Sequence, residues 1–420
     1  MPGFGSAEID ELYKMFYPRQ WFFRHVAQTS PSPLALEIVR AEGSRLTAAD
    51  GKTYLDGIGG ISVCHLGHGH PRVRAAIHQQ VDAYLHVMVY GEMVLSPQTS
   101  YAHRLASLLP ASLDCVYFTS SGAEAVEGAM KLAKRRTGRP GIAAFRHSYH
   151  GSTQGALSLI GDEYWRSAYR PLLPGIQEME HGSLQDLFRI GTDTACVVAE
   201  VVQAEKGVVP SSAPWLQALR DRCDAIGAML VFDEIQTGFG RTGTLWAFEG
   251  YGVVPDILLL GKALGAGMPL GAFIASRECM EALSTDPVLG HITTFGGHPV
   301  SCAAGLAGLE ALLTEGHLER VSGKGQLFRE RLQHPMIRDF RQAGLLMALD
   351  FGHADVNQRI IARCLAKGLL TDWFLFAPQC LRLAPPLTIT PEEIAEACQI
   401  IVEACTEEEN VSESQTETAV

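Results

Sequence analysis

Short apolar runs alternate with helical stretches through the middle of this chain, and this alternation restricts the fold more than any other feature. CVYF (115–118) leads into SSGAEAVEGAMKLAKRR, and WLQALRDRCDAIG precedes MLVFDEI (229–235). Further apolar runs are ACVVAEVV (195–202), DILLLG (256–261) and AFIAS (272–276). Strands alternating with helices predict an α/β architecture, a mostly parallel sheet covered by helices on both faces. In such a sheet, ligands bind at the carboxyl ends of the strands.

The segments on either side of this region have different patterns. Before about residue 70, LTAADGKTYLDGIGG places an Asp50-Gly51 turn between two extended runs. After about residue 311, a long helix, three short apolar runs and a helix from Pro391 give an α+β pattern. The end of the chain, TEEENVSESQTETAV, is polar and acidic. We expect an N-terminal segment (1–70) that packs with the small domain, a large cofactor-binding domain (71–310), a smaller C-terminal α+β domain (311–405) and a disordered tail (406–420).

Charge and cysteine usage exclude several classes of function. The 46 acidic residues outnumber the 34 basic ones, which argues against a nucleic-acid partner. The ten cysteines occur singly with no C-x-x-C motif, so we predict no metal site, and single thiols suit a reducing compartment. We see neither an apolar run long enough to span a membrane nor a secretory signal. We therefore expect a cytoplasmic protein with no membrane partner.

Residues 238–243, GFGRTG, match the G-x-G-x-x-G fingerprint of a dinucleotide-binding turn. That fingerprint requires a helix directly after the glycines and an acidic residue about 20 residues further on. Here TLWAFEGYGVVPD follows, which is not a helix start, and the residue about 20 positions on is Lys262. We therefore reject a dinucleotide site here.

Asp233 and Lys262 each follow an apolar strand, in LVFDE and DILLLGKAL. Parallel strands would carry both side chains to the same edge of the sheet. A lysine in an apolar setting can form a Schiff base, and a nearby carboxylate can keep a pyridinium nitrogen protonated. This is the pair that pyridoxal phosphate (PLP) chemistry requires. From these two residues alone, a buried Asp–Lys ion pair is the alternative.

Ser121, Gly122 and Ala123 follow the strand CVYF and open a helix. The free N–H groups and the positive end of the helix dipole form a phosphate site. The alternative is an ordinary N-cap at Ser120 or Ser121, with Glu124 completing a capping box. Both interpretations can hold together.

Eight motifs together resemble those of the class III aminotransferases, the ω-aminotransferases of PLP-dependent fold type I. The resemblance covers about residue 31 to about residue 405, and the motifs come in the order of that family: TYLDGIGGISVCHLGHGHP, TSSGAEAVEGAMKLAK, HSYHGST, EVVQAEKG, LVFDEIQTGFGRTG, LLLGKALGAGMPLGA, TTFGGHPVSCAAGL and LRLAPPLTIT. The family includes ornithine, acetylornithine and γ-aminobutyrate aminotransferases. The resemblance implies the type I fold, PLP as cofactor and a homodimer with shared active sites, which can pair further into a tetramer.

The resemblance also implies a role for each matching residue. Lys262 would form the Schiff base with PLP and shuttle the proton, and Asp233 would bond the pyridine nitrogen. Gln236 would sit near the phenolic oxygen of the ring, and Tyr149 would stack on the ring unless it is only a core aromatic. The remaining residues, all at the phosphate, would be Ser121, Gly122, Ala123 and, from the neighbouring subunit, Thr294.

The resemblance implies a substrate switch with one departure. Arg382 would bind the α-carboxylate of an oxo acid such as 2-oxoglutarate or pyruvate, and Glu205 would pair with Arg382 when the other substrate lacks that carboxylate. Ser152 stands where the ornithine, acetylornithine and γ-aminobutyrate enzymes usually carry an arginine. Ile61 stands where ornithine δ-aminotransferase has a tyrosine.

We therefore predict a ping-pong aminotransferase whose donor is an amine or ω-amino acid with a weaker demand for a distal carboxylate. Three arginines are candidates to replace the missing clamp, namely Arg146, Arg166 and Arg170. Two alternatives remain open: an amino-acid racemase or epimerase of the same fold, and a non-catalytic PLP-binding protein.

Overall fold

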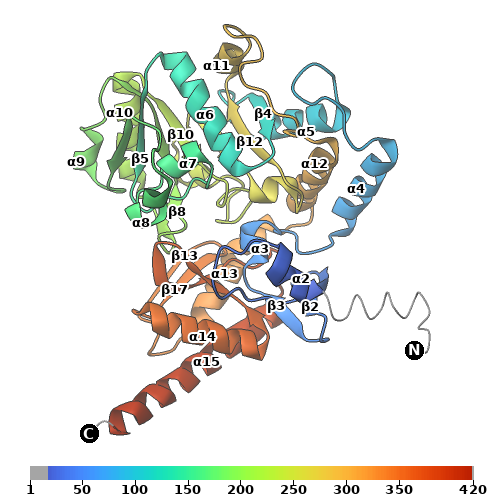
Figure 1. Ribbon diagram of the computed structural model, residues 1–420, viewed down its shortest axis with the longest axis vertical. Coiled ribbons are helices and arrows are strands. Elements are labelled where there is room, and N and C mark those ends of the chain that lie inside the picture. Colours follow the sequence, from blue (N-terminus) through green and yellow to red (C-terminus); the bar gives the residue numbers. More distant parts are fainter. Residues whose placement is uncertain (1–17, 419–420) are drawn as a thin grey trace.

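A seven-stranded sheet forms the centre of the molecule (Figure 1). The computed structural model describes residues 18–418, with side chains up to residue 411. The strand order is β4 (Cys115–Thr119), β12 (Gly271–Ala275), β11 (Ile257–Leu260), β10 (Met229–Asp233), β7 (Thr194–Ala199), β5 (Gly141–Phe145) and β6 (Ile176–Met179). Only β12 runs antiparallel to its neighbours in this sheet. The predicted mostly parallel α/β sheet is therefore confirmed.

Both faces of the sheet are covered by apolar layers. Val231 and Leu259 belong to the cluster that contains α6 (Gly122–Thr137), whereas Phe232 and Leu258 belong to the larger cluster on the opposite face. Successive strand residues thus contribute to opposite cores, as the period of two requires. Because both faces are buried, these strands read as continuous apolar runs.

Further helices cover the sheet and the adjoining segments. They are α2 (Pro18–His25), α3 (Gly59–Ser62), α4 (Pro71–Ala83), α5 (Ser96–Ser107), α7 (Gln154–Ser158), α8 (Glu163–Arg166), α9 (Leu184–Leu187), α10 (Ala213–Ile226), α11 (Arg277–Met280) and α12 (Pro299–Thr314). The 3-10 turns are η1 (Ser167–Tyr169), η2 (Ala247–Tyr251), η3 (Lys262–Gly265), η4 (Glu281–Leu283) and η5 (Leu318–Arg320). A two-stranded ribbon joins β8 (Val202–Gln203) to β9 (Val209–Pro210).

The two ends of the chain form neighbouring sheets. The first has the order β1 (Ile38–Glu42), β2 (Arg45–Ala48), β3 (Thr53–Asp56) and β15 (Leu369–Leu370). The second has the order β13 (Asp339–Ala343), β14 (Leu346–Asp350), β17 (Ala377–Leu383) and β16 (Asp372–Phe374). Helices α13 (Val321–Arg331), α14 (Ala354–Lys367) and α15 (Pro391–Thr418) belong to the same C-terminal unit.

The predicted turn at Asp50-Gly51 joins β2 to β3, and Gly51 has the positive φ of 84° that such a turn uses. β3 pairs in parallel with β15, so the N-terminal segment lies beside the C-terminal unit (Figure 1). This pairing agrees with the expected packing of the N-terminal segment against the small domain. The division itself stays a prediction.

Two expected boundaries differ from the structure. The boundary between residues 310 and 311 falls inside α12, which continues to Thr314 and ends just before Gly316. The tail expected to be disordered from residue 406 instead continues α15. Glu408 is buried there between Arg359 and Arg363 of α14, so a polar sequence is held in a helix by ion pairs.

Candidate active site

Asp233 and Lys262 lie at the same edge of the central sheet. Asp233 ends β10, and Lys262 follows β11 after one glycine. The two strands are parallel neighbours, with Asp233 opposite Leu259. Lys262 adopts φ 47°, a left-handed conformation that is rare for a lysine and that starts the turn η3. The predicted common edge is therefore observed.

Asp233 is buried and held by two hydrogen bonds. Its Oδ1 accepts from the Ile235 amide at 3.0 Å, and its Oδ2 lies 2.7 Å from Nδ1 of His150. Burial lowers the pKa of His150, but the hydrogen bond and charge of Asp233 raise it by more. Asp233 and His150 thus form one charged unit rather than the Asp–Lys ion pair that was the alternative.

Lys262 instead donates to Oε1 of Gln236 at 2.9 Å. Burial lowers the pKa of the Lys262 ammonium to about 8. A lowered pKa leaves a larger fraction of the amine neutral, which is the form that attacks a carbonyl. Nε2 of Gln236 is buried without a hydrogen-bond partner among the described residues.

The N-terminus of α6 packs against the segments that carry these residues. A methyl group on Gly122 would lie 2.8 Å from Cδ1 of Ile235, and one on Gly261 would lie 3.0 Å from Cγ2 of the same side chain. Ser121 is the N-cap, and its hydroxyl accepts from the amide of Glu124 at 3.2 Å. The carboxylate of Glu124 accepts from the Ser120 amide at 2.7 Å. The capping interpretation therefore holds.

The capped helix end still offers donors to an anion. The first N–H groups of a helix have no partner inside the helix, and here these include the amides of Gly122 and Ala123. The positive end of the dipole adds to the attraction for a phosphate. Both interpretations of this motif are therefore compatible with the structure.

Tyr149 is brought to the same place by its neighbours in the chain. His150 bonds to Asp233, and Gly151 packs so closely on α6 that a methyl group on Gly151 would lie 2.6 Å from Cβ of Ala123. Gly151 has φ 128°, which favours glycine. The hydroxyl of Tyr149 lies 3.1 Å from that of Ser152.

This set of groups fits the phosphorylated pyridine aldehyde implied by the sequence. It comprises an amine of lowered pKa, a buried carboxylate for a ring nitrogen, an unpartnered amide donor and an open helix N-terminus. These features come from three different segments of the chain. No single segment would hold such a ligand.

Arg382 and Glu205 form a buried ion pair near Lys262. Nη2 of Arg382 donates to Oε2 of Glu205 at 2.8 Å, and Nε of Arg382 lies 3.1 Å from Oδ1 of Asp372. Burial lowers the pKa of Arg382, while the charges of Glu205 and Asp372 more than offset this effect. Both members of the pair act electrostatically on Lys262.

The three arginines considered as replacements for the missing clamp are engaged elsewhere. Arg146 pairs with Glu178, Arg170 pairs with Glu163, and Arg166 pairs with both glutamates. The three arginines and two glutamates thus form one network of ion pairs. The structure offers no described arginine beside Ser152 that takes the place of the clamp.

Thr294 is exposed and forms no hydrogen bond with Ser121, Gly122 or Ala123 within the described chain. Its contact with a phosphate in a neighbouring subunit stays a prediction. Ile61 lies in α3 with φ 62°, a conformation that strains a β-branched residue.

The sequence analysis missed two members of the site. His150 follows Tyr149 directly in HSYHGST, and this adjacency was the available signal. Glu200 is buried, and burial raises its pKa to about 8. Its charge acts on both His150 and Lys262. Nothing in the local sequence distinguishes Glu200 from the other acids.

The GFGRTG stretch joins the two parts of the molecule rather than opening a helix. Arg241 is fully buried and donates to the carbonyl oxygens of Leu345 at 3.0 Å and Pro385 at 2.7 Å. Its Nε also donates to His65 at 3.3 Å. The rejection of a dinucleotide turn is therefore consistent with the structure.

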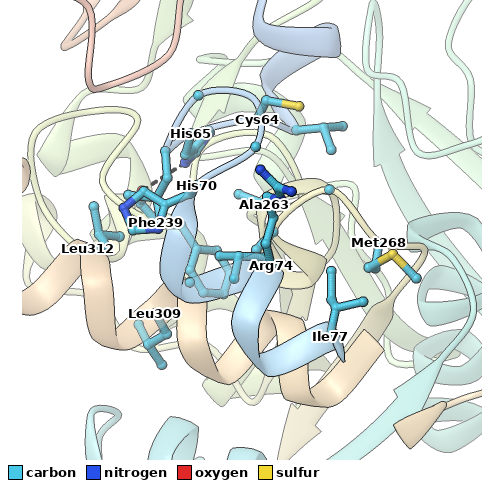
Figure 2. A pocket seen from close by; sticks show the side chains of 18 residues that line it. Cys64, His65, His70, Arg74, Ile77, Phe239, Ala263, Met268, Leu309 and Leu312 are labelled. Carbon is cyan, nitrogen blue, oxygen red and sulfur yellow. Dashed lines mark hydrogen bonds between the residues drawn. The ribbon is translucent and has the colours of Figure 1, made fainter. Parts of the chain in front are cut away.

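A cavity of about 200 Å³ lies on another side of the Lys262 turn (Figure 2). Ala263, Cys64 and Phe239 line it, with Leu309 and Leu312 of α12 on the opposite wall. None of the predicted cofactor or substrate residues lines this cavity. It is separate from the candidate site.

Residues 18–418 contain no helix that is long and apolar enough to cross a bilayer. Across the part of the chain that the structure describes, no three His, Cys, Asp or Glu side chains are grouped as metal ligands.

Comparison with protein families gives a match over nearly the whole chain. The family described as Aminotransferase class-III matches residues 26–405. An acetylornithine aminotransferase from Streptomyces coelicolor is 40% identical over 367 residues, which cover 86% of this chain and 89% of that protein. A putrescine aminotransferase from Pectobacterium atrosepticum is 36% identical over 375 residues, covering 85% and 79% respectively.

Solved structures give the same answer for the fold. The ornithine aminotransferase of Toxoplasma gondii has a TM-score of 0.87 at 27% identity and covers 97% of this chain and 99% of its own. A PLP-bound amine transaminase from an uncultivated Pseudomonas species has a TM-score of 0.83 at 28% identity, covering 90% and 97%. These relatives are PLP-dependent transaminases of fold type I.

Proposed function

This chain belongs to the class-III aminotransferase family and is a PLP-dependent aminotransferase. From that premise we propose that it transfers the amino group of an amine or ω-amino acid to an α-oxo acid, with little demand for a distal carboxylate on the donor. The observation that carries the proposal is the absence of a free arginine at Ser152 beside an intact Arg382–Glu205 pair. The relatives named above are aminotransferases, which supports amino-group transfer over the racemase alternative.

The cofactor, when bound, supplies an aldehyde that condenses with amines and a ring that delocalises the electron pair left after proton loss. Nζ of Lys262 would hold that aldehyde between turnovers. Once displaced by the donor amine, the same Nζ would remove a proton from the donor Cα. It would then deliver this proton to the carbon that carried the aldehyde. Its pKa of about 8 lets it both accept and release that proton near neutral pH.

Asp233 would hold the proton on the ring nitrogen. Its carboxylate is buried and is held in position by hydrogen bonds with His150 and the Ile235 amide. The amide groups at the start of α6 would bind the phosphate, and Tyr149 would cover one face of the ring. Nε2 of Gln236, which has no hydrogen-bond partner among the described residues, would donate to the phenolic oxygen.

Arg382 would bind the α-carboxylate of the oxo acid through its planar fork of donors. In the structure the guanidinium is paired with Glu205, which is the state suited to a donor without that carboxylate. Exchange of Glu205 for a substrate carboxylate would let one pocket accept both substrates.

We also propose a homodimer in which Thr294 of each subunit reaches the phosphate site of the other. Thr294 is exposed and lies in a loop with several exposed apolar side chains, including Val288, Leu289, Ile292 and Phe295. A second exposed apolar segment contains Met88, Met93 and Val94. Contiguous exposed apolar surface of this kind marks interfaces.

A panel of amine donors and oxo acids, read out as separate half-reactions, tests the proposed function. A suitable donor alone should shift the absorbance of the cofactor to that of its amine form, and pyruvate or 2-oxoglutarate should restore it. Donors with and without a distal carboxylate should react at comparable rates. A strong preference for the distal carboxylate would contradict the proposal.

Lys262→Ala tests the assigned amine, with Lys324→Ala as the control. Burial also lowers the pKa of Lys324 to about 8, but this lysine lies in α13 and bonds to Leu387 O. Lys262→Ala should abolish turnover, and Lys324→Ala should retain it. Unchanged turnover in Lys262→Ala would refute the assignment, and a donor that loses its chirality without any spectral change would indicate a racemase.

A further inference from the structure

Arg382 lies between two carboxylates rather than beside one. Its Nη2 donates to Oε2 of Glu205 at 2.8 Å, and its Nε lies 3.1 Å from Oδ1 of Asp372. The Arg382 side chain is only 4% exposed, and Oδ1 of Asp372 is shielded from solvent. The exchange proposed at Arg382 uses only Glu205, so Asp372 is a second negative charge without an assigned role.

The two carboxylates belong to different parts of the fold. Glu205 lies in the turn between β8 and β9, whereas Asp372 lies in β16 and is directly opposite Arg382 of β17 in the sheet register. The backbone of Asp372 is therefore fixed beside Arg382 by the pairing of two neighbouring strands. Displacement of Glu205 by a substrate would leave this pairing in place.

The residues that follow Asp372 in β16 also hold the guanidinium. The carbonyl oxygen of Trp373 accepts from Nη2 of Arg382 at 2.8 Å, and the centre of the Phe374 ring lies 4.5 Å from the guanidinium carbon. None of these contacts involves Glu205. Arg382 is thus anchored on β16 independently of Glu205, and Glu205 is the group that an entering carboxylate can replace.

Asp372 alters the charge that a substrate meets at Arg382. Burial raises the pKa of Asp372 to about 6, an effect that the charge of Arg382 opposes, so the carboxylate is mainly ionised at neutral pH. With Glu205 displaced, Arg382 and Asp372 together carry no net charge. A substrate carboxylate is then attracted less strongly than it would be by an arginine without a second partner.

We propose that Asp372 is a specificity-determining residue, a permanent counter-charge that positions Arg382 and keeps the affinity of the site for α-carboxylates low. This inference rests on the proposed function and concerns the same site. The α-amino acid product carries the same carboxylate as the oxo acid, so a low affinity would favour its release and the return of Glu205.

Asp372→Asn tests the inference because it removes the charge and keeps the size of the side chain. Propionate, an unreactive analogue of pyruvate, should bind the variant holoenzyme about tenfold more tightly than the wild type, as measured by titration of the cofactor absorbance. KM for pyruvate or 2-oxoglutarate should fall by a similar factor. The uncharged propionamide should bind both proteins equally.

The donor half-reaction separates this role from a structural one. Glu205 still pairs with Arg382 in Asp372→Asn, so the rate with an amine that lacks an α-carboxylate should stay within about threefold of the wild-type rate. Loss of a merely structural contact would lower both half-reactions.

Matched variants control for charge and folding. Asp372→Glu keeps the charge and should restore the wild-type affinity for propionate, while Asp372→Ser removes the charge through a smaller side chain and should act like Asp372→Asn. Asp339→Asn should change nothing, since Asp339 is exposed and pairs with Arg341 in the same sheet. Unchanged cofactor absorbance and unfolding midpoint in each variant would show an intact fold.

The inference is overturned if propionate binds Asp372→Asn and Asp372→Ser no more tightly than the wild type, or if both half-reactions fall alike. Loss of the folded state in both variants would show a role in stability alone and would equally overturn it. A wild-type protein that converts no donor would instead overturn the proposed function, and the propionate titrations would still decide the inference.

Discussion

Lys262 and Asp233 lie at the same sheet edge but have different hydrogen-bond partners. The lysine has no carboxylate partner, so burial lowers its pKa to about 8. The aspartate is hydrogen-bonded to His150 and accepts a hydrogen bond from the Ile235 amide. Two groups that sequence reasoning could have joined in one ion pair are therefore kept apart, with the amine free to react.

The reactivity of Lys262 should depend on pH in a defined way. The neutral amine is the reactive form, and its fraction rises as the pH increases through about 8 instead of 10.5. The rate at which cofactor-free protein attaches added PLP, trapped with borohydride, should therefore rise through this range. Lys262→Ala should show no such attachment. A rate that rises only above pH 10 would contradict the lowered pKa.

Glu205→Gln should separate the two half-reactions. The substitution removes one of the two carboxylates that pair with buried Arg382 and leaves Asp372. A donor without an α-carboxylate then binds next to a cation that has lost one of its partners. We expect kcat/KM for such a donor to fall at least about tenfold, while that for the oxo acid is kept or raised. Separate half-reaction rates measure both effects.

Glu180→Gln is the control for Glu205→Gln, since Glu180 is partly exposed and pairs with Lys206. It should leave both half-reactions unchanged. Equal losses in the two half-reactions of Glu205→Gln would show that Glu205 supports the fold and does not act as a switch.

At the scale of elements, the site depends on close packing between α6, the Tyr149 loop and the loop after β10. Glycines at 122, 151 and 261 permit this approach, because a methyl group at each would meet a neighbour within 3.0 Å. The start of α6 thereby reaches the carboxyl edge of the sheet, where β10 and β11 end. The local sequence gives the helix and the strands, but their contact depends on these small residues.

Gly151→Ala should weaken this packing. The new methyl group would lie 2.6 Å from Cβ of Ala123, and alanine is strained at φ 128°. We expect a loss of about 1–3 kcal/mol in the free energy of unfolding, together with weaker cofactor retention. Urea unfolding and absorbance after dialysis measure the two effects.

Gly323→Ala is the matched control for Gly151→Ala. It lies in the exposed interior of α13 with open space around it, so alanine should raise the free energy of unfolding by up to about 1 kcal/mol. A Gly151→Ala protein as stable as the wild type, with full cofactor retention, would show that the loop can shift without cost.

At the scale of the whole molecule, the N-terminal and C-terminal segments form one region beside the large sheet (Figure 1). Arg241 connects the GFGRTG loop to carbonyl groups at Leu345 and Pro385 in that region. Arg382, from β17, pairs with Glu205, which lies in the turn between β8 and β9. The substrate site is therefore built between regions that are distant in sequence.

Val94→Asp tests the proposed dimer. Val94 is 89% exposed, so the substitution should not disturb the fold of one chain. If this segment is buried between subunits, a buried carboxylate would oppose association. Analytical ultracentrifugation should show twice the mass of one chain for the wild type and the mass of one chain for the variant, with loss of bound PLP.

Phe188→Asp is the control for Val94→Asp, because Phe188 is also exposed but lies just after α9, as its C-cap. It should remain a dimer. A wild-type protein with the mass of one chain, and with full cofactor binding, would contradict a site shared between subunits.

The sequence by itself determined the α/β class, the strands that lead to Asp233 and Lys262, and the helix that Ser121 caps. These features depend on local periodicity, capping and chain order, which are written in neighbouring residues. The ordered motifs also determined the family, since each keeps its residue types at fixed spacing. The roles of individual residues at the cofactor and substrate stay predictions.

Only the tertiary structure decided which charges meet. His150 was not singled out in the sequence, yet it lies 2.7 Å from Asp233, and Glu408 holds α15 where the polar composition predicted a disordered tail. The three arginines that were candidates for a clamp instead form ion pairs with Glu163 and Glu178. Pairing and burial depend on contacts between segments far apart in the chain, and the pKa of Lys262 depends on those contacts rather than on its neighbours in sequence.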